Sequence, residues 1–312
     1  MNTRQYMPPS RDGVGASRVA LPPGPWLTLL DFLAQQFPTI ARTEWQARMQ
    51  QGEVLDENGQ ALPATTPYQA HSRIFYYRSL PQEPQIPFDE VVLYRDDYLV
   101  VADKPHFLPV TPAGRYLQQT LLVRLKRSLG IETLTPMHRI DRETAGLVLF
   151  TIQPQTRNLY QSLFRQRSVQ KYYEAIAPWR TDLVPPLSFP LLRCSRLVES
   201  ASFMKMMEID GAPNAETRIE CIEVHGELAR YGLHPVSGQK HQLRAHMAAL
   251  GMPIVNDRIY PHLYPDEGSE QDYCAPLQLL AKAIRFTDPI SGLERTFESR
   301  QRLDFQQENR KT

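Results

Sequence analysis

Short segments that alternate apolar and polar residues, joined in pairs by turn-forming residues, recur through most of this 312-residue chain. Such alternation places successive side chains on opposite faces of a strand, and a tight turn makes two strands antiparallel neighbours. The pattern predicts an α+β fold on a mainly antiparallel or mixed central sheet. The clearest pairs of segments are 91–94 with 98–101, 217–224 with 227–234, and 280–286 with 294–297.

Helical spacing of apolar residues is confined to a few segments, which we expect to flank that sheet. Leucines between Leu117 and Leu129 recur at three- and four-residue intervals, and the run ends at Gly130, a residue type common at helix C-termini. The pattern also predicts a helix after Pro154, a helix over about 241–250, and strands over 147–151 and 171–177.

The first quarter of the chain has a different pattern. Residues 1–25 are rich in glycine and proline without apolar periodicity, so we expect a flexible N-terminal arm. Residues 26–78 predict a small α/β module of two helices and a strand, with Thr43 and Gln46 as a capping box for the second helix. The remaining divisions are a proline-rich linker over 79–90, one large domain over 91–300 and a polar tail over 301–312.

Composition excludes several classes of protein. Hydrophobic residues make up 42% of the chain, yet no stretch of about 20 apolar residues occurs, so we expect no membrane contact. Few, scattered cysteines fit a reducing compartment, so we expect a cytoplasmic protein. The three cysteines, Cys194, Cys221 and Cys274, are too widely spaced for a thiolate zinc site or a disulfide framework. His241 and His246 are five residues apart and do not share a helix face, so we expect no metal.

Charge is unevenly distributed, although the formal net charge of the whole chain is only +1. Between Arg115 and Lys171 lie ten arginines and lysines against three acidic residues, a local charge of +7. Such a segment can face an RNA phosphate backbone, where each neutralised phosphate adds salt-dependent affinity, or it can form a solvated basic face. The charge alone leaves both interpretations open.

Within this basic segment, the run HRIDRETAG at 138–146 directly precedes an apolar strand. Asp141 stands between Arg139 and Arg142, whose positive charges favour an ionised carboxylate that can act as a nucleophile or a base. These residues also fit an arginine–aspartate turn that caps the strand.

The longer run HRIDRETAGLVLF resembles the HRLDRDTSGLLL-type motif of the RluA-type RNA pseudouridine synthases. Three further segments match that family in order: DDYLVVADKPHFLPV resembles its entry hairpin, KYYEAIA its K-x-Y-x-A strand, and SGQKHQLRAHMAALGMPIVND its T-G-R-x-H-Q-I-R-x-H…G-x-P-I-x-G-D segment. The likeness covers about residues 89–297. This sequence departs from the usual family residues at Ala145, Gln239, Lys240 and Asn256, the last of which stands where the family usually has glycine.

The resemblance implies the pseudouridine synthase fold and the isomerisation of a uridine within RNA, without metal, nucleotide or redox cofactor. Asp141 matches the catalytic aspartate, Tyr173 the strand tyrosine over the base, and Arg244 the arginine that pairs with the aspartate. In that family the aspartate is proposed either to attack the anomeric carbon or to promote a glycal intermediate, and both routes stay open. The target nucleotide is expected to leave the RNA stack for a pocket, which costs a few kcal/mol.

Further RNA or base contacts are expected from Arg139, Arg142, Lys171, His241 and Leu243. The module at 26–78 weakly resembles an RNA-binding domain, named after a ribosomal small-subunit protein, that many family members carry, but its charge of −1 suggests a degenerate form. We therefore expect a monomeric enzyme, with ribosomal RNA rather than transfer RNA as the first candidate for its substrate. The alternative is a noncatalytic RNA-binding or ribosome-assembly factor on the same fold.

Overall fold

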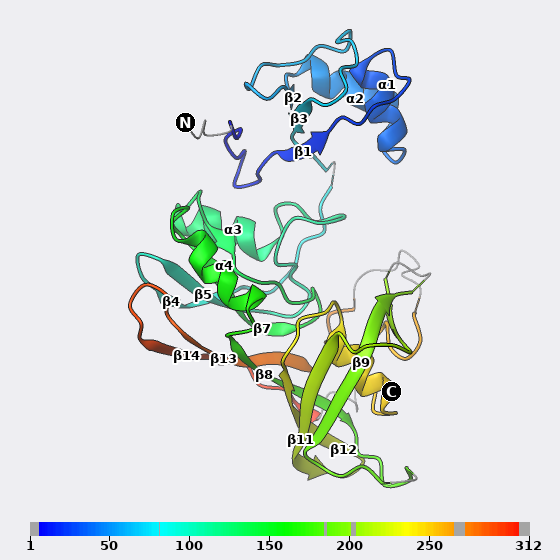
Figure 1. Ribbon diagram of the computed structural model, residues 1–312, viewed down its shortest axis with the longest axis vertical. Coiled ribbons are helices and arrows are strands. Elements are labelled where there is room, and N and C mark those ends of the chain that lie inside the picture. Colours follow the sequence, from blue (N-terminus) through cyan, green and yellow to red (C-terminus); the bar gives the residue numbers. More distant parts are fainter. Residues whose placement is uncertain (1–5, 81, 184–185, 201–203, 265–271, 306–312) are drawn as a thin grey trace. The chain divides into compact units, whose positions relative to one another are not determined.

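The alternating segments pair as predicted and join one mixed sheet of 11 strands (Figure 1). The protein is represented by a computed structural model that describes residues 6–80, 82–183, 186–200, 204–264 and 272–305. The chain divides into two units, 1–84 with 112–132, and 85–111 with 133–312. The large sheet belongs to the second unit.

The large sheet contains every strand predicted for it, to within a few residues, and three unpredicted strands over 135–136, 191–199 and 206–209. Its strands are β4 (Val91–Arg95), β5 (Leu99–Lys104), β6 (Thr135–Pro136), β7 (Ala145–Thr151), β8 (Gln170–Pro178), β9 (Leu191–Glu199), β10 (Met206–Ile209), β11 (Ala215–His225), β12 (Leu228–Pro235), β13 (Leu279–Thr287) and β14 (Glu294–Glu298). Their order is β10-β9-β11-β12-β8-β13-β7-β5-β4, with β14 beside β13 and β6 beside β7. Among these described strands, β13 and β7 pair in parallel and the other pairs are antiparallel.

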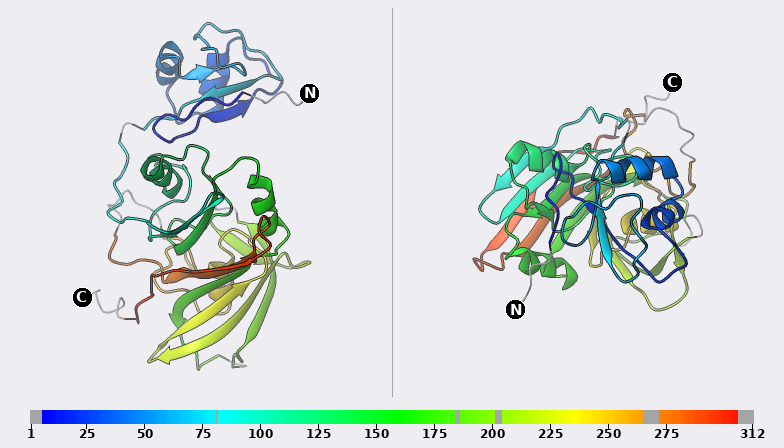
Figure 2. Two further views of the ribbon diagram at one scale, coloured as in Figure 1. Left: turned by 90° about the vertical axis from the view of Figure 1, so that its left-hand side faces the viewer. Right: turned by 90° about the horizontal axis from the view of Figure 1, so that it is seen from above.

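The two halves of this sheet run in different directions. Figures 1 and 2 show β9, β11 and β12 crossing the direction of β5 and β13. Each neighbouring pair of strands adds a twist of roughly 20–25°, which accumulates over so many strands. The described helices of this unit cover the two halves separately: α4 (Arg157–Arg165) packs Tyr160 with Leu149 and Ile284, and α5 (Gln242–Ala249) packs Leu243 with Tyr231.

The centre of the sheet depends on a close approach between β7 and β13. Gly146 lies opposite Ala281, has a φ of 108°, and leaves no room for a side chain, because a Cβ there would be 2.3 Å from the Ala281 carbonyl oxygen. Only glycine allows this approach. On its other side Ala281 lies opposite Tyr173 of β8. The start of β7 and the middle of β8 therefore flank the same point of β13.

The described residues of the smaller unit form the three-stranded sheet β1-β3-β2 and three helices. Leu33, Trp45 and Ile74 form its fully buried centre. Its elements are β1 (Ser17–Ala20), α1 (Leu29–Gln36), α2 (Arg42–Gln50), β2 (Val54–Leu55), β3 (Arg73–Tyr76) and α3 (Leu121–Leu129). None of the helices in the described part of the chain is both long and apolar enough to cross a membrane.

Two boundaries differ from the predictions. The expected arm at 1–25 contains β1, which pairs with β3, so residues 17–20 belong to the small sheet; residues 1–5 lie outside the described part. The segment 112–132, predicted within the large domain, groups with the small unit. Glu83 of the expected linker contributes to this grouping, because its carboxylate accepts the backbone N–H groups of residues 117–119 at 2.6–2.9 Å.

The predicted capping box was placed on the wrong helix. Thr43 lies inside α2, which begins after Ala41 without a side-chain cap. The capping box is on α1, where the Asp31 N–H donates to Thr28 Oγ1 at 3.2 Å and the Thr28 N–H donates to Asp31 Oδ2 at 3.0 Å. Aspartate at this position satisfies the same backbone N–H group as the glutamate or glutamine of the usual pattern.

Candidate active site

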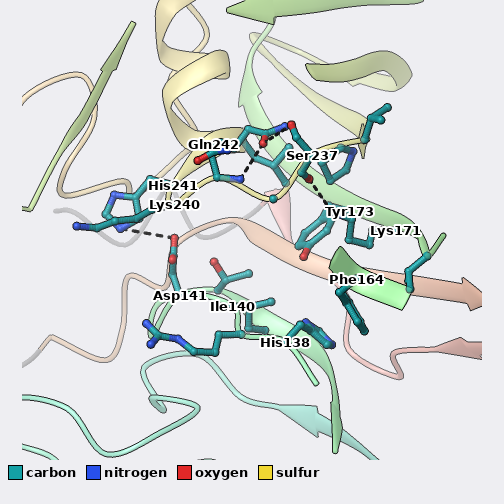
Figure 3. Close-up of a pocket in the computed structure, with 18 of the residues that line it drawn as sticks. His138, Ile140, Asp141, Phe164, Lys171, Tyr173, Ser237, Lys240, His241 and Gln242 are labelled. Atoms are coloured by element: carbon teal, nitrogen blue, oxygen red, sulfur yellow. Dashed lines mark hydrogen bonds and ion pairs between the residues drawn. The ribbon is translucent and has the colours of Figure 1, made fainter. Parts of the chain in front are cut away.

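A cavity of about 690 Å³ opens beside the start of β7 (Figure 3). Its walls come from three stretches, 136–144, 164–173 and 235–244, together with Leu279 of β13. This volume lies within the roughly 300–1,000 Å³ of small-ligand sites. The cavity collects seven residues predicted from the sequence: Arg139, Asp141, Lys171, Tyr173, His241, Leu243 and Arg244.

A buried arginine holds the Asp141 carboxylate. Arg244, on α5, is 1% exposed, and its Nη1 donates to Asp141 Oδ2 at 3.2 Å. The same guanidinium makes two parallel bonds to Asp257, both 2.8 Å long. Burial acts to lower the pKa of Arg244, but Asp257 and then Asp141 raise it above its ordinary value. One fixed positive charge therefore serves two carboxylates.

Asp257 belongs to the site but was not predicted from the sequence. Its Oδ1 also accepts the backbone N–H groups of Ile259 and Tyr260 at 2.8 and 3.0 Å. The preceding residue, Asn256, has a φ of 63°, a left-handed conformation that asparagine adopts more readily than most residues. This explains why asparagine can stand where the family pattern has glycine. The sequence did contain a signal for Asp257, which is the last residue of the matched segment PIVND.

Tyr173 projects into the cavity that contains Asp141 (Figure 3). β8 alternates as predicted: Lys171 and Tyr173 line the cavity, whereas Tyr172 packs with its ring centroid 4.9 Å from that of His234. Burial, with a smaller contribution from Asp141, raises the pKa of Tyr173 above its ordinary value of 10. The phenol therefore stays protonated at neutral pH and can donate a hydrogen bond.

A buried polar network fixes the loop before α5. Ser237 Oγ donates to Gln242 Oε1 at 2.8 Å, and Gln242 Nε2 donates to Thr217 Oγ1 at 2.9 Å. On the cavity side, Lys171 Nζ donates to the Ser237 carbonyl oxygen at 2.6 Å (Figure 3). The network holds one wall of the cavity in place.

Two histidines at the cavity are neutral near pH 7. Burial lowers the pKa of His138 to about 3, and the Leu149 N–H donates to its Nε2 at 3.2 Å, so the ring proton is on Nδ1. Burial also lowers the pKa of His241, whose Nε2 lies 3.8 Å from Asp141 Oδ2. Because a neutral His241 brings no positive charge, Arg244 is the charge partner of Asp141.

The histidines do not assemble a metal site. His246 contacts Thr217 Oγ1 through Nδ1 and Ser195 Oγ through Nε2, both at 3.0 Å, whereas His241 Nδ1 lies 3.3 Å from the Tyr260 hydroxyl. Within the described ranges, no group of three or more His, Cys, Asp or Glu side chains is placed to hold a metal ion.

Lys104 holds the loop that carries Asp141. It is fully buried at the end of β5, and its Nζ donates to the carbonyl oxygens of Arg142 at 3.1 Å and Pro105 at 2.9 Å. Burial lowers the pKa of Lys104 to about 7, against the opposing effect of Glu143 and Asp141. Lys104 thus positions the backbone of the loop that carries Asp141, from within the matched entry hairpin.

The lowered pKa of Lys104 predicts a pH-dependent stability. Between about 7 and the ordinary value of 10.5 the unfolded chain binds more protons than the folded chain at this residue. The free energy of unfolding should therefore rise with pH across this window, relative to Lys104→Met, which has no group to protonate. Urea titrations of both proteins at several pH values measure this difference. A difference that stays constant over the window would contradict the prediction.

Positive side chains dominate the cavity. Among its lining residues, Asp141 is the one acidic side chain, against six cations: Arg139, Arg165, Arg167, Lys171, Lys240 and Arg244. The predicted basic segment is divided between the two units, since Arg115, Arg124, Lys126 and Arg127 belong to the small unit. Arg142 does not line the cavity; its Nε donates to Glu143 at 2.8 Å, and its contact with RNA stays a prediction.

Known proteins resemble the chain over the region that builds this cavity. Residues 98–249 match the model of the RNA pseudouridylate synthase family. An uncharacterised RNA pseudouridine synthase of Synechocystis sp. is 30% identical over 237 residues, 74% of this chain and 79% of the relative. The dual-specificity RNA pseudouridine synthase RluA of Escherichia coli K12 is 31% identical over 221 residues, 70% of this chain and 94% of the relative.

A solved structure shares the fold. The human RNA pseudouridylate synthase domain containing 4 superposes with a TM-score of 0.51 at 26% identity, over 69% of this chain and 88% of that chain. This likeness and the mixed sheet confirm the expected pseudouridine synthase fold. Since the similar relatives cover most of both chains and the matched residues include Asp141, Tyr173 and Arg244, the chain belongs to the RluA-type family of RNA pseudouridine synthases.

Proposed function

We propose that this enzyme isomerises specific uridines of RNA to pseudouridine in the cavity, with Asp141 as the reacting carboxylate. The observation that carries the proposal is the bond between Arg244 and Asp141 in a cavity that also contains Tyr173. A guanidinium fixed by Asp257 supplies the counter-charge without help from the substrate. Asp141 remains 27% exposed, so its carboxylate is still accessible from the cavity.

The reaction balances without a second substrate. The bond between N1 of uracil and C1′ of ribose breaks, the base turns, and C5 bonds to C1′; C5 loses a proton and N1 gains one. Asp141 either attacks C1′ or promotes loss of the C2′ proton to give a glycal, and Tyr173 is the group proposed to relay that proton. The Tyr173 ring and the Leu243 side chain offer an apolar surface to the flipped base.

Tyr173→Phe tests the proton relay, because it keeps the ring and removes the hydroxyl. We expect the single-turnover rate at saturating RNA to fall about 10²-fold, the lower end for acid–base groups, with nearly unchanged RNA affinity. Tyr173→Leu is the control that removes the stacking surface as well and should also weaken binding. Near-normal turnover in the Phe variant would leave Tyr173 with a packing role alone.

Release of tritium from RNA labelled at C5 of uridine tests the proposed function, because the C5 hydrogen must leave. The purified protein should release tritium without added metal or nucleotide. RNA binding without release would identify the alternative, a noncatalytic RNA-binding or ribosome-assembly factor. Loss of release with EDTA and its recovery with zinc would contradict a reaction free of cofactors.

We propose that the substrate is ribosomal RNA rather than transfer RNA. Support comes from the likeness of the 26–78 module to an RNA-binding domain named after a ribosomal protein. The name of the Escherichia coli relative, a dual-specificity enzyme, allows more than one kind of target. Pseudouridine mapping in total RNA from cells with and without the gene identifies the target. Sites lost from transfer RNA alone would contradict the ribosomal assignment.

A further inference from the structure

The turn after α4 carries an arginine where the backbone favours glycine. The Ser168 N–H donates to the Leu163 carbonyl at 2.8 Å, and the Arg167 N–H donates to the Phe164 carbonyl at 3.2 Å. These two bonds define a Schellman motif, whose residue just beyond the helix adopts the left-handed conformation. The φ of Arg167 is 57°. A Cβ crowds the backbone in this region, so glycine is the more stable choice.

Other helices of the chain are also followed by a residue in the left-handed conformation, and that residue is glycine. α2 and α5 are followed by Gly52 and Gly251, with φ values of 69° and 75° and the same pair of backbone bonds. α3 ends at Gly130 with a φ of 67°. Among the described helices with a left-handed end, α4 alone has a residue with a side chain there. The turn itself does not require arginine.

The Arg167 side chain is exposed and lines the cavity. It forms no hydrogen bond or ion pair with any residue that the structure describes. Burial and, to a smaller extent, repulsion from the nearby Arg167 lower the pKa of Lys171 to about 8. The acid that lines the cavity, Asp141, is already paired with Arg244. Two neighbouring cations without an acid between them form a site for an anion.

We propose that Arg167 binds a backbone phosphate of the RNA beside the flipped uridine. This proposal rests on the proposed function, which brings RNA to the cavity. A guanidinium suits the contact because it can donate two parallel hydrogen bonds to one phosphate. The strained turn holds the guanidinium at the cavity and is retained for that contact, as strained residues often are at functional sites.

Arg167→Gly tests the backbone strain and the phosphate contact separately, because it relieves the strain of the left-handed turn and removes the positive charge. We expect the thermal unfolding midpoint to rise by about 2–4 °C. The Kd for RNA should rise about fivefold, and the slope of log affinity against log salt should become shallower by about 0.7–0.9. Arg167→Lys should retain most of the slope. Arg95→Asn, which removes an exposed charge at the end of β4 outside the cavity, is the charge-matched control.

An unchanged Kd and salt slope in Arg167→Gly would overturn the phosphate contact, as would an equal change in Arg95→Asn. A lower unfolding midpoint in Arg167→Gly would overturn the argument from strain. Tritium release by the unchanged protein distinguishes this inference from the proposed function. Normal release with an unchanged slope refutes the phosphate contact alone. An altered slope without any release refutes the isomerase and supports the contact.

Discussion

Asp141→Asn is expected to abolish turnover while the fold and RNA binding persist. Asparagine keeps the shape of the side chain, and its oxygen still accepts a bond from Arg244 Nη1, which lies 3.2 Å from Asp141 Oδ2. An amide is neither a competent nucleophile nor a base. The single-turnover rate should fall by about 10³-fold or more, equivalent to roughly 4 kcal/mol of lost transition-state stabilisation. Tritium release at saturating RNA measures this loss.

Glu143→Gln is the matched control for Asp141→Asn. Glu143 is two residues away, pairs with Arg142 and does not line the cavity, so removing its charge should keep turnover within about tenfold of the original. Gel-shift titrations and circular dichroism verify binding and fold. Turnover by Asp141→Asn comparable with that of the control would refute Asp141 as the reacting group.

Arg244→Met is expected to lower the free energy of unfolding by about 3–5 kcal/mol. The side chain of Asp257 is 0% exposed, and the variant leaves this carboxylate buried without its charge partner. Asp141 loses its counter-charge in the same variant, so turnover should fall as well. Urea unfolding measures the stability change independently of activity.

The double variant Arg244→Met with Asp257→Leu is the control for this effect. Removing both charges removes the uncompensated carboxylate, so much of the lost stability should return while turnover stays low. Arg244→Lys keeps one charge but lacks the planar fork that reaches both carboxylates. A loss of less than about 1 kcal/mol in Arg244→Met would show that Asp257 does not depend on the buried pair.

The predicted hairpins and helices were local features of the sequence. β4 with β5, β11 with β12, and β13 with β14 each join neighbouring segments through a short turn, so alternation and turn residues suffice to predict them. α5 and the strand β8 also appear where their patterns placed them. The alternation of Lys171, Tyr172 and Tyr173 was predictable for the same reason.

Five strands were not predicted. β2 and β6 have only two residues each. The other three have partners far along the chain or weak patterns. β1 lies in the segment whose glycines and prolines suggested a flexible arm, and its partner β3 comes more than 50 residues later in the chain. β9 and β10 mix exposed apolar residues, such as Leu192 and Met207, with charged ones. Their pairing with each other and with β11 stabilises them. Local propensity does not report such contacts.

The sequence by itself determined the family through four ordered motifs, and these motifs made Asp141, Tyr173 and Arg244 the candidate site residues. Only the tertiary structure decided how they meet. Ala281 lies opposite both Gly146 and Tyr173, which brings two distant motifs to one cavity. The fold likewise bonds Asp257 to Arg244 and leaves Arg142 outside the lining. Strand register and burial arise from contacts between segments far apart in the chain, whereas a motif records only residues close along it.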